Sequence, residues 1–182
     1  MTNEAVRTIS PYIDAVTVDF KAAGDPDFYK TVSAVPDVKP IFETLKAFKL
    51  AGTHIEITNL VIPKIGDSMH KIKCIAQWIN DYLGPNTPFH LLRFHPDYKM
   101  TTLPVTPIKD MENAYLTAKG EGLLFTYLGN MPEHVAENTY CPACSEPVIH
   151  RNSFEITKWN LTNDMHCEFC GNHLPIKGKH YP

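Results

Sequence analysis

The sequence predicts an α/β protein with a sheet of parallel strands, followed by a small module built on four cysteines. In the first 137 residues, short segments rich in β-branched residues alternate with amphipathic segments, which is the pattern of βα units. From about Asn138 this pattern stops, and cysteine, proline, glycine and asparagine become frequent. We therefore expect two domains, over residues 1–137 and 138–182.

Four segments predict the strands. Each is short and rich in Val, Ile, Leu, Phe or Thr, and one of them runs directly into Pro63. A complete (β/α)8 barrel needs about 250 residues, so four such strands make only part of that architecture. The predicted strands cover residues 15–20, 54–62, 89–94 and 123–128.

Amphipathic segments between the strands predict the helices. Residues 38–51 carry Pro40 in the first turn, an apolar stripe at helical spacing and Gly52 just past the end. Residues 67–83 have the same layout, with a capping residue at the start and a glycine after the end. The remaining helices are predicted over residues 109–121 and, as the end of a longer helix, 4–13.

The composition is that of an ordinary globular protein. The 182 residues are 43% hydrophobic and 20% charged, which allows one full domain and a small one. The net charge of -3 gives no general attraction to nucleic acid, and no apolar run approaches the ~20 residues that span a bilayer. Because residues 1–10 lack the apolar core of a signal peptide, we expect a cytoplasmic protein with neither nucleic-acid nor membrane partners.

The sharpest signal is a pair of C-x-x-C motifs, formed by Cys141 with Cys144 and by Cys167 with Cys170. Each motif makes a tight turn whose two thiolates converge on one ion, and two such turns complete a tetrahedron. Without an export signal, four such cysteines indicate a metal site rather than disulfides. We expect structural zinc, although iron fits the same thiolates and the spacing does not separate the two metals. The fifth cysteine, Cys74, is expected to be a small core residue.

The segment between the two motifs predicts what surrounds the metal. Residues 148–149 and 154–156 can pair as short strands, which gives a zinc-ribbon or rubredoxin-like module. A segment of this size has little core of its own, so the metal should supply much of its folding free energy.

Polar residues recur where the predicted strands end. In parallel sheets, chemistry collects at the carboxyl ends of the strands. A carboxylate, an amine and an imidazole at one rim could hold a zwitterionic, hydroxyl-rich ligand. The polar residues at these ends are Asp19, Lys21, Thr58, Asn59, Arg93, His95, Asp97, Tyr98, Tyr127 and Asn130.

Several of these residues lie in motifs that run in the order seen in one family. The motifs are VDFKA at residues 18–22, ITNLVIP at 57–63, RFHPDYK at 93–99, GNMP at 129–132 and ENTYCP at 137–142. On these motifs, which extend over nearly all of the chain, the sequence resembles the radical S-adenosylmethionine enzyme of the AmmeMemoRadiSam system. That enzyme is a relative of the pyruvate-formate-lyase activating enzymes.

The resemblance implies a partial (β/α) barrel of the radical S-adenosylmethionine type with a cysteine-rich tail. Members of the family bind a [4Fe-4S] cluster and cleave S-adenosylmethionine reductively to a 5'-deoxyadenosyl radical. By similarity to the activating enzymes, Asp19, Lys21 and His95 would line the S-adenosylmethionine pocket. Thr58 and Asn59 occupy the neighbourhood in which those enzymes often carry an arginine, and we include both in the predicted cofactor site.

One family motif is absent. The cluster is held in the family by C-x-x-x-C-x-x-C, and the sequence contains no such motif. The resemblance therefore implies the C-terminal half of the enzyme, inactive alone and dependent on an N-terminal, cluster-bearing half as partner. One alternative is a catalytically dead, zinc-stabilised protein-binding module. Another is a metal-dependent hydrolase that uses His90, His95 and Asp97 around a second ion, although the first two lie on opposite faces of a straight strand.

Overall fold

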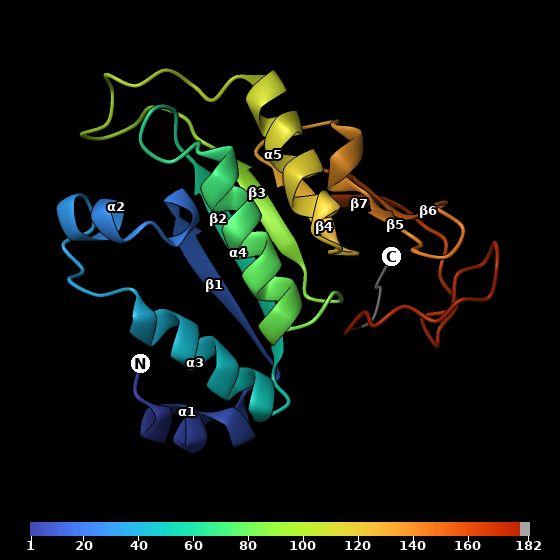
Figure 1. Ribbon diagram of the computed structural model, residues 1–182. Helices are drawn as coiled ribbons and strands as arrows, with labels where there is room; N and C mark the ends of the chain where they lie inside the picture. Colours follow the sequence, from blue (N-terminus) through green and yellow to red (C-terminus); the bar gives the residue numbers. More distant parts are fainter. Residues whose placement is uncertain (179–182) are drawn as a thin grey trace.

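Four parallel strands form the centre of the structure, a computed structural model that describes residues 1–178 (Figure 1). The strands are β1 (Ala15–Lys21), β2 (His54–Val61), β3 (Phe89–Arg93) and β4 (Thr126–Gly129), and they lie side by side in chain order. Every neighbouring pair is parallel. The predicted parallel sheet is thus confirmed, with β4 starting three residues later than expected.

Three crossover helices cover one face of the sheet (Figure 1). They are α3 (Lys39–Leu50), α4 (Met69–Tyr82) and α5 (Ile108–Gly120). Alternate residues of β2 are buried, as expected when one face of a strand packs on helices. Each fully buried Leu, Ile or Met side chain contributes roughly 1.5–3 kcal/mol. The side chains without exposed surface in this core include Phe20, Leu45, Ile57, Ile72, Ile79, Phe89, Leu91 and Met111.

The N-terminal segment adds shorter helices. Helix α1 (Asn3–Ile9) continues into a 3-10 turn over Ser10–Tyr12, and α1 packs against α3. Helix α2 (Pro26–Thr31), which the sequence analysis did not predict, starts after Asp25, whose carboxylate accepts the Asp27 N–H at 3.1 Å. A proline at the first helical position and a capping carboxylate stabilise even this short helix.

The end of the chain forms a second, antiparallel sheet from β5 (Thr139–Tyr140), β6 (Pro147–Asn152) and β7 (Glu155–Trp159). The predicted pairing of two short strands is confirmed, and β5 is an additional strand. The module has its own buried cluster, which Phe125 joins from the segment before β4. The domain boundary at residue 137 stays a prediction. The last four residues of the predicted second domain, 179–182, lie outside the described residues. Within residues 1–178, every helix is too short or too polar to cross a membrane.

The prediction for Cys74 was wrong. Its side chain is exposed, and its Sγ lies 3.7 Å from His70 Nε2, one helical turn away. The buried stripe of α4 passes through Ile72, Ile75 and Ile79, so position 74 falls outside the face that packs on the sheet.

Two leucines of α3 offer a matched test of the core. Leu45 is 0% exposed and Leu50 is 90% exposed. We expect Leu45→Ala to lower the free energy of unfolding by about 2–5 kcal/mol, because it leaves a cavity beneath the sheet. Leu50→Ala should change it by less than about 0.5 kcal/mol. Urea unfolding followed by circular dichroism measures both, and equal losses would contradict the described packing.

Candidate functional site

Three of the predicted rim residues meet at the carboxyl end of β1 and β2. Lys21 Nζ donates to Asp19 Oδ2 at 2.6 Å, and Thr58 Oγ1 donates to Asp19 Oδ1 at 3.0 Å. The strands bring these side chains together. Asp19 and Lys21 are two residues apart and so share a face of β1, and Asp19 lies opposite Thr58 of β2 in the parallel register. All three side chains project from the sheet face that carries no helices. An amine, a carboxylate and a hydroxyl are thus held together near solvent.

Asn59 lies on the opposite, helix-covered face. It is fully buried, its Oδ1 accepts the Ala23 N–H at 2.7 Å, and its Nδ2 has no hydrogen-bond partner in the described part of the chain. Ala22 and Ala23 have φ of 48° and 53°, left-handed values that are unfavourable for alanine. Asn59 therefore fixes the turn that follows β1 rather than joining Asp19 at the rim.

His95 lies beyond the end of β3 and is exposed. The chain just before it is fixed by Thr106, a buried residue that the sequence analysis did not single out. Thr106 Oγ1 donates to the Val61 carbonyl at 2.7 Å and accepts the Phe94 N–H at 3.2 Å. One hydroxyl thus ties the ends of β2 and β3 together and sets where the segment with His95 leaves the sheet.

The four cysteines of the two C-x-x-C motifs converge as predicted. Their sulfur atoms all lie within 4.8 Å of one another, and the pairs Cys141–Cys170 and Cys144–Cys167 are each 3.7 Å apart. Four sulfurs bound at about 2.3 Å to a tetrahedral ion stand about 3.8 Å apart. The donor set therefore fits one tetrahedral zinc or iron ion. Within residues 1–178 it is the only group of three or more potential ligands that does so, which leaves the hydrolase hypothesis without a metal site.

The thiols also interact electrostatically. Burial opposes ionisation of Cys141, but hydrogen bonds from the backbone N–H groups of Cys144 and Ala143 and contacts with the neighbouring thiols lower its pKa to about 7. The backbone N–H of Glu146 favours the Cys144 thiolate, yet desolvation and the other three sulfurs outweigh it and raise the pKa of Cys144 to about 12. Without a cation the thiolates oppose one another, so a bound metal is what allows all four to ionise.

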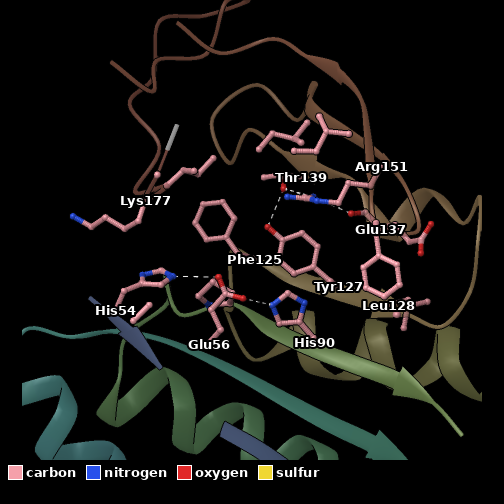
Figure 2. Close-up of a pocket in the computed structure, with 18 of the residues that line it drawn as sticks. His54, Glu56, His90, Phe125, Tyr127, Leu128, Glu137, Thr139, Arg151 and Lys177 are labelled. Carbon is pink, nitrogen blue, oxygen red and sulfur yellow. Dashed lines mark hydrogen bonds and ion pairs between the residues drawn. The ribbon is translucent and has the colours of Figure 1, made fainter. Parts of the chain in front are cut away.

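A cavity of about 910 Å³ lies between the uncovered face of the sheet and the cysteine module (Figure 2). On its sheet side, Glu56 accepts from His54 Nε2 at 3.2 Å and from His90 Nε2 at 2.9 Å. The hydrogen bond from His90, together with the one from His54, lowers the pKa of Glu56 to about 2. Tyr127 of β4 stacks on the His90 ring at a centroid distance of 4.9 Å. Glu56 could not be singled out from the sequence, because alternation along a strand is equally typical of a polar sheet face turned to solvent.

Comparison with known proteins gives the fold but not the activity. No protein-family model matches the chain. An uncharacterized protein of Methanocaldococcus jannaschii is 41% identical over 165 residues, which cover 90% of this chain and 49% of that protein. The chain thus spans about half the length of the curated relative that it matches. A crystal structure of a domain of pyruvate-formate lyase-activating enzyme from Bacteroides vulgatus superposes with a TM-score of 0.60 at 18% identity, covering 71% of this chain and 75% of that one. The likeness shows that the fold is that of this activating-enzyme domain.

The metal site predicts a specific loss on mutation. We expect the purified chain to carry about one zinc or iron ion, measured by elemental analysis, and Cys144→Ser to lose most of it. The thermal unfolding of the variant should begin at lower temperature, because the module then lacks its main stabilising contact. Cys74→Ser is the matched control and should keep both the metal and the melting temperature. Full metal occupancy in Cys144→Ser would contradict the four-thiolate site.

The Glu56 cluster predicts a pH-dependent contribution to stability. Its pKa in the fold, about 2, is below the ordinary value of 4.5. The carboxylate therefore stabilises the fold above pH 4.5, and the stabilisation is lost as the pH falls from 4.5 towards 2. Because the group is half-exposed, we expect Glu56→Gln to cost on the order of 1 kcal/mol at pH 6 and almost nothing near pH 2. Urea unfolding of both proteins across this range tests it; a cost that does not vary with pH would contradict the assignment.

Proposed function

We propose that the chain is the C-terminal part of a radical S-adenosylmethionine enzyme related to the pyruvate-formate-lyase activating enzymes. The observation that carries the proposal is the group of Asp19, Lys21 and Thr58 at the carboxyl end of a parallel sheet with the fold of an activating-enzyme domain. The motif resemblance and the half-length match to a longer relative support it. In this proposal the four strands are part of a barrel that another portion of the enzyme completes.

The rim residues suit the amino-acid end of S-adenosylmethionine. Lys21 supplies a cation for its carboxylate, and Asp19 supplies an anion for its ammonium group. Thr58 positions Asp19 through the 3.0 Å hydrogen bond, and His95 extends the rim from the end of β3. In the unbound chain Lys21 and Asp19 pair with each other, so the ligand would exchange one exposed ion pair for two.

The [4Fe-4S] cluster does not fit this chain. Of its five cysteines, four already converge on one site, and Cys74 alone cannot replace the three thiolates of the family motif. Reductive cleavage therefore needs cluster ligands from a further portion, on the same polypeptide or on a partner. Strand β1 offers a place for it: it is an edge strand of the described sheet, paired only with β2, and Ala15, Thr17 and Asp19 are exposed along it.

The alternative is a catalytically dead, zinc-stabilised module that binds a protein partner. The same lack of cluster ligands favours it, and it needs no S-adenosylmethionine. The two candidates differ in whether the rim binds this cofactor.

Titration calorimetry with S-adenosylmethionine separates them. We expect binding by the chain together with the remaining portion of the longer relative, which in this proposal carries the cluster. Asp19→Asn and His95→Ala should each weaken it at least tenfold, because each removes a polar contact to the cofactor. Asp27→Asn, which removes an exposed carboxylate of α2, is the control and should bind normally. An absence of binding even with the cluster-bearing portion would favour the dead module.

The cluster itself gives a second test. Anaerobic reconstitution with iron and sulfide should yield the absorption of a [4Fe-4S] cluster only when the cluster-bearing portion is present. A [4Fe-4S] spectrum from the chain alone would overturn our account of the missing ligands.

A further inference from the structure

The cavity between the uncovered sheet face and the cysteine module is separate from the proposed cofactor rim. None of the five residues predicted to bind S-adenosylmethionine lines it. Its volume, about 910 Å³, is in the range of small-molecule sites, which are mostly apolar with a few fixed polar groups. The apolar part of its wall includes Phe125, Ile149, Ile156, Pro175 and Ile176.

Arg151 of β6 is a fixed cationic group in the wall of this cavity. Its Nη1 donates to the Glu137 carbonyl at 3.0 Å and to Thr139 Oγ1 at 2.8 Å, and its guanidinium carbon lies 5.6 Å from the centre of the Tyr127 ring (Figure 2). The backbone is held as well, because the Arg151 N–H donates to Asn138 Oδ1 at 2.8 Å. The guanidinium is therefore positioned before any ligand arrives, which lowers the entropic cost of binding.

The charge of Arg151 has no ion-pair partner in the described structure. Both groups that accept from it are neutral, and no carboxylate oxygen of residues 1–178 lies within 4.0 Å of its nitrogen atoms. The carboxylate of Glu56 is already bound by two histidines, and that of Glu137 accepts the Ser153 N–H at 3.4 Å. Partly buried charges are normally paired. Lys177, which also lines the cavity, adds a second cation without a described ion pair.

We propose that this cavity binds a small organic anion. A carboxylate or phosphate group of the ligand would pair with the guanidinium of Arg151, with Lys177 at the edge, and an apolar body would lie against Phe125 and Ile149. The planar guanidinium can bind either a carboxylate or a phosphate through two parallel hydrogen bonds. We therefore predict an oxyanion group on the ligand, which both have in common. The proposal does not depend on binding of S-adenosylmethionine.

Paired probes test the anion and the apolar body separately. The full chain is titrated with indole-3-acetate, with phenyl phosphate and with the uncharged indole-3-ethanol. We expect at least one anion to bind, and indole-3-ethanol to bind at least tenfold more weakly than indole-3-acetate if the carboxylate is the group recognised. Equal affinity of all three, or no binding by either anion, overturns the proposal.

Variants locate the site. Arg151→Gln should weaken binding of the anion at least tenfold, and Lys177→Gln two- to threefold, because Lys177 is exposed. Arg7→Gln removes an exposed arginine of α1 and should change nothing. If Arg151→Gln fails to fold, as circular dichroism would show, Arg151→Lys keeps the charge but loses the fork and should still weaken binding several-fold. Full affinity in a folded Arg151 variant overturns the assignment.

Discussion

The arrangement of this structure depends on what lies against each of the two faces of its parallel sheet. Parallel sheets are normally buried on both faces, because their crossover helices pack on each side. Here α3, α4 and α5 all lie on one face, so these helices leave the other face uncovered (Figure 1). Over β2, β3 and β4 the cysteine module faces it across a cavity that is partly open to solvent. The carboxyl end of β1 lies outside this cavity, and there Asp19 and Lys21 meet. The cavity and the rim with Asp19 and Lys21 thus lie on different parts of the same sheet face.

The metal site and the cavity are linked through β6. This strand belongs to the sheet that the four cysteines hold in place, and it carries Arg151. The buried cluster around the cysteines is small, and Phe125 joins it from outside the module. A metal at the four-cysteine site would supply much of the folding free energy of such a module, and would therefore also fix the position of the guanidinium.

Local features were predictable, and features that depend on strand register or on packing of the module were not. The spacing of apolar residues gave the three long helices and the parallel strands, and the C-x-x-C pairs gave the metal ligands. Strand β5 was missed because two residues form it only by pairing across the module. Asn59 was grouped with Asp19 because both stand at strand ends, but alternation along the strand sends its side chain to the other face. The contact of Arg151 with Tyr127 arises only when the module packs on the sheet.

The turn after β1 has a consequence for the unfolded chain. Ala22 and Ala23 stand where glycine would be the easier residue, and the hydrogen bond from Ala23 to Asn59 compensates part of the strain. Alanine leaves the unfolded chain fewer conformations than glycine, so less entropy is lost when the turn forms. The bond to Asn59 then selects one conformation of the turn. The strand end that carries Lys21 is therefore held by a stiff connection, and a flexible glycine there would let it move.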